Sequence, residues 1–151
     1  MEADIKDPYV AGGLPDHWDS PHAPLEATFV CVLKPSLEKR GLRLIINQSR
    51  GIRRYDVHEL ILTDEDDAGP GGEVNRIAYI GFVEFLCGGL LVAGQSVAVN
   101  GKAIGEIAGF DETHMPNHQN IVLKGTPRVS GYDRRYRLGD KVTFIPLCGE
   151  D

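Results

Sequence analysis

The sequence predicts an all-β fold, a small closed or nearly closed antiparallel barrel of about seven to eight short strands. Short apolar segments rich in β-branched and aromatic residues recur along the chain, with turn residues between them. The 18 glycines and 9 prolines cut the 151 residues into pieces too short for long helices. Asn100-Gly101 lies between two alternating apolar segments, which is the strongest short-range signal for a hairpin with a type I′ turn. Barrel closure is favoured because it removes exposed strand edges.

We divide the chain into an irregular N-terminal arm, residues 1–25, and a single barrel domain, residues 26–151. Four prolines and two adjacent glycines interrupt regular structure in the arm. Its Tyr9, Leu14 and Trp18 are apolar enough to dock on the body or on a neighbouring subunit. We therefore expect a homo-oligomer that forms through the arm.

The first half of the domain is predicted to hold three strands. EATFVCVLK, residues 26–34, predicts the first strand and ends at Pro35. PSLEKRG predicts one helical turn that ends at Gly41, and LRLIINQS predicts the second strand. A third strand is expected around 54–62. The acidic, glycine-rich residues 64–73 predict a mobile solvated loop, without the ligand spacing of an EF-hand.

The second half begins with RIAYIGFVEFLCGGLLVAG, the most apolar part of the chain. Its composition favours strands, and Gly81, Gly88 and Gly89 predict bends or bulges in a curved sheet. The Asn100-Gly101 hairpin predicts strands at about 95–99 and 102–109. QNIVLKG and LGDKVTFIPL predict two more, the last entered through a Gly139-Asp140 turn.

Charge and hydropathy exclude several classes of function. The formal net charge of −6 argues against a protein that grips nucleic acid through its phosphates. There is no signal-peptide pattern and no long apolar run, so we expect a soluble cytoplasmic protein without a membrane partner. Cys31, Cys87 and Cys148 predict reduced thiols rather than disulfides. The sequence leaves open whether Cys87, beside two glycines, is reactive or merely buried.

The stretch GFDETHMPNHQNIVLKG holds the best candidates for chemistry. His114 and His118 follow Asp111 and Glu112, and Pro116 between the histidines excludes a helical arrangement, so a turn would have to gather them. They could be ligands of a divalent metal, or a general base oriented by one of the carboxylates. An unmetallated polar site and a plain connecting loop remain alternatives. His58 joins the site only if the fold brings it near His118.

Arginines gather in RGIRRYD and GYDRRYRLGD, two short stretches of an otherwise acidic protein. Guanidinium groups bind carboxylates and phosphates in bidentate fashion, so convergence of the two stretches would form an anion pocket. An ordinary surface network with neighbouring aspartates is the alternative. The candidate ligand-binding residues are Arg50, Arg53, Arg54, Arg134, Arg135, Arg137 and Tyr136.

The segment GGLLVAGQSVAVNGKAIGEIAGFDETHMPNHQNIVLKG, followed by LGDKVTFIP, resembles the glucitol/sorbitol-specific IIA component of the phosphotransferase system. The resemblance covers roughly the last 70 residues and implies a small all-β fold. That family carries a phosphoryl group on a histidine before the hairpin. No histidine occurs from Glu59 to Thr113, so the phosphocarrier role does not transfer. We expect the chain to belong to an uncharacterised bacterial family of small barrels.

Two functions follow from the sequence. The first is a binding protein for a small anionic metabolite, in a pocket lined by the arginines and by His114 or His118. The second is a small barrel enzyme, a lyase, isomerase or metal-assisted enzyme, that uses His114 and His118 as base or metal ligands. A structural subunit of a larger complex is a third class.

Overall fold

The computed structural model describes residues 24–147, and that part of the chain contains strands and turns but no helix. No helix long and apolar enough to cross a membrane is therefore found within it. The strands are β1 (Leu25–Val32), β2 (Ser36–Leu37), β3 (Leu42–Arg43), β4 (Ser49–Ile52), β5 (Val57–Thr63), β6 (Glu73–Val74), β7 (Ile77–Phe85), β8 (Gly89–Val92), β9 (Ser96–Val99), β10 (Lys102–Asp111), β11 (Asn120–Lys124) and β12 (Lys141–Ile145). The predicted arm lies outside the described residues apart from its last two positions.

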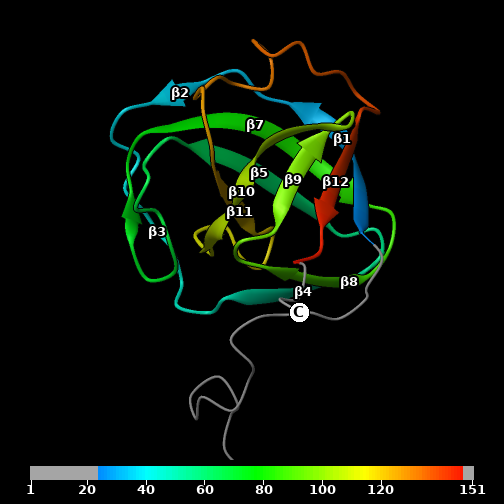
Figure 1. Cartoon of the computed structure of the whole chain (residues 1–151), viewed down its shortest axis with the longest axis horizontal. Helices are drawn as coiled ribbons and strands as arrows, with labels where there is room; N and C mark the ends of the chain where they lie inside the picture. Colours follow the sequence, from blue (N-terminus) through cyan, green and yellow to red (C-terminus); the bar gives the residue numbers. More distant parts are fainter. Residues whose placement is uncertain (1–23, 148–151) are drawn as a thin grey trace, which may run out of the picture.

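One eight-stranded sheet organises the fold, in the order β1-β12-β9-β10-β11-β5-β7-β2. Because β1 also pairs with β7, the sheet returns on itself as a ring, which Figure 1 shows. The predicted all-β class and the large, mostly antiparallel sheet are confirmed. The prediction of purely antiparallel pairing is wrong at one place, because β11 and β5 run parallel. Turn signals predict pairing only between strands that follow each other in the sequence, and β5 and β11 are far apart in the chain.

Two apolar cores pack against opposite faces of this sheet. Leu60 and Leu62 of β5 belong to the larger core, to which all seven strands of the ring contribute and which fills its interior. Ile61 points the other way and packs with Leu42 and Leu44 in a second core on the outer face. The alternation follows from the two-residue period of a strand. The outer core is covered by the segments that carry β3 and β6.

The segment before β3 differs from its prediction. Residues 35–41 form no helical turn, because Ser36 and Leu37 pair with β7 as a short strand. The predicted second strand shrinks to Leu42–Arg43, paired with β6. The predicted third strand, around 54–62, corresponds to β5, which begins only at Val57 because Arg54 and Tyr55 form a turn in which Tyr55 has φ 75°. Tertiary pairing has overridden local propensity in the first two cases.

The hairpin and bulge predictions are confirmed. Asn100 and Gly101 have φ of 50° and 84°, the two positive values that a type I′ turn requires, and Val99 pairs with Lys102 across them. Gly81 of β7 faces β1 next to a register shift between Phe29 and Cys31. A Cβ at Gly81 would collide with the carbonyl oxygen of Cys31 and touch the Phe29 ring at 3.0 Å.

Replacing Gly81 by alanine should therefore destabilise the ring. Since the colliding atom is backbone, β1 must move, and we expect the free energy of unfolding to fall by about 2–3 kcal/mol. Gly51→Ala is the matched control, because a Cβ at Gly51 of β4 meets nothing within 4 Å. Urea denaturation of both variants measures the difference, and equal stabilities would contradict the packing described for β1 and β7.

Candidate acid–base site

The candidate site is built on a row of four residues that crosses the outer face of the sheet. The pairings place Phe82 of β7 opposite Glu59 of β5, Glu59 opposite Asn120 of β11, and Asn120 opposite Asp111 of β10. The row lies one step beyond the outer core, in which Ile61 and Val122 are paired neighbours. Three polar side chains thus lie side by side where the apolar cover ends.

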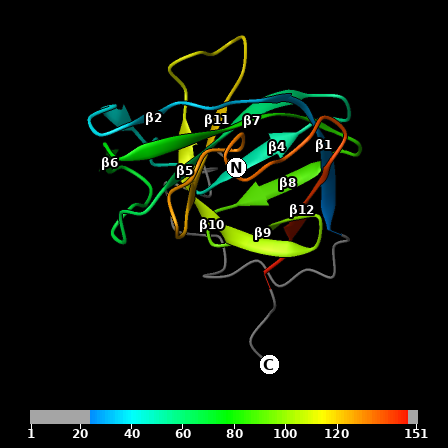
Figure 2. The ribbon, with the colours of Figure 1, turned by 90° about the horizontal axis from the view of Figure 1, so that it is seen from above.

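The loop 112–119 joins the end of β10 to the start of β11 and projects from the ring, as Figure 2 shows. Its residues form turns, and the His114 carbonyl accepts hydrogen bonds from the N–H groups of Asn117 and His118, at 2.9 and 3.3 Å. This turn stacks the His114 ring on the His118 ring, with centroids 4.9 Å apart. The prediction that a turn rather than a helix gathers the two histidines is confirmed.

The central contact joins His118 to Glu59. Nε2 of His118 lies 3.2 Å from Oε1 of Glu59, and the two side chains are only 12% and 7% exposed. Nδ1 of the same ring lies 2.9 Å from Oδ1 of Asn117 and donates its proton there. Nε2 of the neutral ring is then an acceptor, so the hydrogen bond to Glu59 needs a proton on the carboxyl group.

Burial shifts both groups toward their neutral forms. Desolvation raises the pKa of Glu59 to about 7, and Asp111 adds to the rise while Arg40 opposes it. Desolvation also lowers the pKa of His118. The rings of His114 and His58 lower it further by electrostatic repulsion. A neutral carboxylic acid bonded to a neutral imidazole is consistent with both directions.

Aromatic contacts fix the plane of the His118 ring. Phe82 meets it edge to face at a centroid distance of 4.9 Å, and His114 stacks on it with an interplanar angle of 29°. His114 is itself exposed, so it covers His118 from the solvent side. A hollow of about 590 Å³ opens beside the other end of the row and is lined by Asp111, Thr113 and residues 43–47 among others.

Asp111 and Glu112, the two predicted carboxylates, have different partners. Asp111 is buried, and its oxygens accept hydrogen bonds from Thr113 and from the amide of Asn120 at 3.0 Å each. It therefore shapes the start of the loop and orients Asn120. Glu112 pairs with Arg50 of β4 at 3.0 Å. Neither carboxylate is hydrogen-bonded to a histidine among the residues that the structure describes.

His58 lies on the opposite face of β5 from Glu59, with its ring against Phe85 of the interior core. Its Nδ1 accepts a hydrogen bond of 2.9 Å from the backbone N–H of Gln119. Its Nε2 lies 3.5 Å from the Asp56 carboxylate. The condition set from the sequence is met, because the fold does bring His58 next to the loop of His118.

The structure does not bring the two arginine stretches together. The backbone N–H of Tyr55, in the first stretch, donates to the carbonyl of Phe85 near one end of β7. The N–H of Gly131, in the second stretch, donates to the carbonyl of Tyr79, which lies six residues and roughly 20 Å from Phe85 along the strand. Within the stretches, Arg53 pairs with Asp56, Arg54 stacks on Tyr55, and Arg134 donates to the carbonyls of Val129 and Pro127. Arg135 and Arg137 are exposed, and Tyr136 stacks on Phe29.

The described residues do not assemble a set of metal ligands. Between Pro24 and Leu147, no group of three or more His, Cys, Asp or Glu is placed to hold a metal ion. His114 and His118 face each other ring to ring, and the Nε2 of His118 is engaged by Glu59. Their arrangement suits proton transfer better than coordination.

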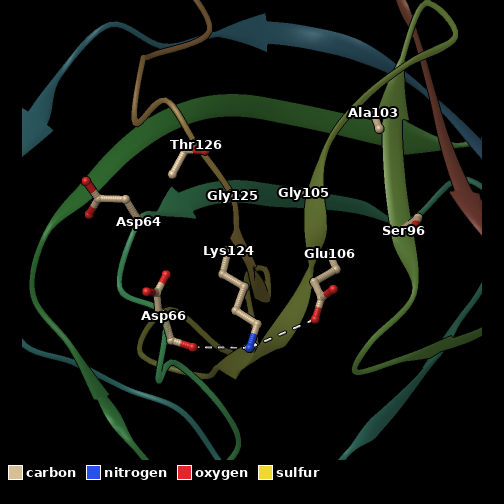
Figure 3. A pocket seen from close by; sticks show the side chains of 9 residues that line it. All are labelled: Asp64, Asp66, Ser96, Ala103, Gly105, Glu106, Lys124, Gly125 and Thr126. Carbon is tan, nitrogen blue, oxygen red and sulfur yellow. Dashed lines mark hydrogen bonds and ion pairs between the residues drawn. The ribbon is translucent and has the colours of Figure 1, made fainter.

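Two other hollows carry less chemistry. Figure 3 shows one of about 520 Å³ at the far end of β11, where Lys124 lies between the carbonyl of Asp66 and the carboxylate of Glu106. Its cation is thus engaged by the acidic residues around it. A more apolar hollow of about 370 Å³ is lined by Cys87, Leu25 and Phe144 among others. Cys87 is a free thiol and is half-buried.

Glu59 and Asn120 are the site residues that the sequence analysis missed. Glu59 lies in the segment YDVHELIL. Whether its side chain is buried depends on the neighbouring strand, which the sequence does not identify. The available signal was a carboxylate flanked by apolar residues in a predicted strand, since such a residue is buried only with a partner. Asn120 gave no comparable signal.

The sequence model of a family of unknown function (DUF6917) matches residues 19–145. Searches of the curated proteins and of the solved structures gave no significant match. The comparisons therefore lend no support to the resemblance to the glucitol/sorbitol IIA component, and bacterial origin stays an expectation.

Glu59 should titrate with a midpoint near pH 7 in carbon-detected NMR, and Glu59→Gln identifies the signal by its loss. Because the folded pKa is raised above 4.5, this group stabilises the fold fully below pH 4.5, and its contribution is lost as the pH rises through about 7. Glu59→Gln should lack that part of the pH dependence of unfolding. A carboxyl midpoint near 4.5 would contradict the buried, neutral pair.

Proposed function

The chain belongs to the family of unknown function DUF6917. We propose that it binds a small anionic molecule and transfers a proton to or from it at an acid–base site. The observation that carries the proposal is the hydrogen bond between Glu59 and His118, two titratable groups buried together at 3.2 Å. A pair of this kind holds or releases one proton near neutral pH, which is the requirement for general acid–base catalysis.

The geometry gives each atom of the pair a role. Oε1 of Glu59 and Nε2 of His118 share the proton, and Asn117 keeps the other ring nitrogen as a donor. No described residue is hydrogen-bonded to Oε2 of Glu59, so a ligand atom can bond to this oxygen without displacing a protein partner. When Oε2 takes a proton from a substrate, the proton on Oε1 moves to Nε2 of His118, and the reverse transfers return both protons in the next step.

Arg40 supports an anionic ligand. Its guanidinium acts on Glu59 electrostatically, and its Nε donates to the Tyr79 hydroxyl at 3.1 Å. Among residues 24–147 it forms no ion pair with a carboxylate, so its Nη groups remain for a ligand. Arg40 is thus the cationic partner of the anionic ligand that the sequence predicts.

The catalytic part is tested by proton exchange with solvent. The protein is incubated in D₂O with a panel of small 2-oxo, 2-hydroxy and dicarboxylic acids, and deuterium incorporation is followed by NMR. We expect at least one acid to exchange faster with the wild type, and Glu59→Gln and His118→Asn to slow that exchange at least about 100-fold. The control Arg137→Gln changes an exposed side chain in the other arginine stretch and should exchange at the wild-type rate.

An acid that binds at the site without gaining deuterium would overturn catalysis and leave a binding protein. If none of the acids shifts the ring signals of His118, the anionic ligand itself is excluded.

Arg40→Gln should weaken binding of any acid found in that panel by about tenfold or more, because a charge-assisted hydrogen bond to the anion is lost. The control is Arg43→Gln, whose exposed side chain pairs with Glu73. Ring-signal titrations of His118 give both dissociation constants. Equal weakening in the two variants would mean that overall charge, and not Arg40, attracts the anion.

A further inference from the structure

We propose that His58 is the positioning residue of the Glu59–His118 pair, and that it holds His118 in place from the opposite face of the sheet only while its Nδ1 is an acceptor. The inference rests on the proposed function. His58 touches neither the ligand side of Glu59 nor the shared proton. It acts through the backbone of Gln119, the residue between His118 and β11.

The backbone N–H and the carbonyl group of Gln119 are hydrogen-bonded to two consecutive residues of β5. Its N–H donates to Nδ1 of His58 at 2.9 Å, and its carbonyl accepts the N–H of Glu59 at 3.0 Å. His118 is bonded directly to this clamped residue, so its ring has little freedom to leave Glu59. One strand thus supplies the anchor from its inner face and the acid from its outer face.

The first of these bonds fixes the protonation state of His58. A ring nitrogen that accepts an N–H bond carries no proton, so the hydrogen of the neutral ring is on Nε2. Nε2 faces the Asp56 carboxylate at 3.5 Å, and Asp56 is held in turn by the N–H of Arg53 at 2.9 Å. Asp56 therefore selects the tautomer that leaves Nδ1 free to accept.

Protonation of His58 would place two N–H donors against each other and break the anchor. The charged groups that act on the ring are Asp56 in the preceding turn, Arg50 of β4 and His118 of the loop, and β7 contributes the uncharged Val83 and Phe85. Burial and Arg50 lower the pKa of His58 against the opposing effect of Asp56. The anchor is thus formed at neutral pH and lost as the pH falls through that lowered value.

The test compares two substitutions that each keep one half of the imidazole. The oxygen of asparagine in His58→Asn can occupy the position of Nδ1 and accept from Gln119, whereas His58→Gln reaches toward Asp56 and leaves Gln119 unpaired. The readouts are hydrogen exchange of the Gln119 amide, the ¹⁵N signal of the His118 Nε2, and the Glu59 titration midpoint. We expect His58→Gln to speed Gln119 exchange about tenfold and to change both side-chain readouts.

His58→Asn should stay close to wild type in all three. If it behaves as His58→Gln does, the acceptor has no special role and the proposal is overturned. It is also overturned if His58→Gln leaves the Gln119 amide and the Glu59 midpoint unchanged. Because a wild-type protein that shows no shared proton would refute only the proposed function, the two failures are distinguishable.

An acid titration of the wild type keeps the inference testable if His58→Gln does not fold. As the His58 ring gains its proton, the Gln119 amide and the His118 ring signals should change with the same midpoint. Independent midpoints for His58 and Gln119 would contradict the anchor.

Discussion

The parallel pairing of β5 with β11 is the constraint on which the site depends. The partners His58 and Glu59 lie at the start of one strand, and only Gln119 separates His118 from the start of the other. An antiparallel pairing would have placed the loop at the far end of β5, beside Thr63. Because the two strands begin at the same end, a loop and a strand separated by almost sixty residues in sequence share one set of hydrogen bonds.

A buried carboxyl group needs a physical reason, since burial disfavours its charged form. Glu59 has that reason in His118, whose accepting nitrogen allows the acid to stay neutral and hydrogen-bonded. Asp111, which is also buried and pairs with Asn120 across β10 and β11, accepts three hydrogen bonds instead. The residues Glu59 and Asp111 are 5% and 2% exposed, so their carboxyl groups are buried to a similar degree but have different hydrogen-bond partners.

Local sequence patterns predicted where the strands lie, but they predicted poorly which segments pair with one another. The Asn100-Gly101 turn, the bulge at Gly81 and the non-helical loop around Pro116 each depend on a few adjacent residues and could be predicted from them. Residues 35–41 and the partner of His118 depend on strands far away in the sequence. Only the fold could reveal that Glu59 faces the loop, or that the arginine stretches contact different ends of β7.

His58 and Glu59 are consecutive residues of β5, and their side chains lie on opposite faces of this single strand. A change in the length of β5 would therefore disturb both residues. An insertion of one residue after the turn at Asp56 would exchange the two side chains between interior and exterior, so that anchor and acid would fail together. An insertion in the projecting loop would lengthen a connection and leave that alternation intact. Natural length variation among members of this family is therefore expected to concentrate in the loop and to spare the first residues of β5.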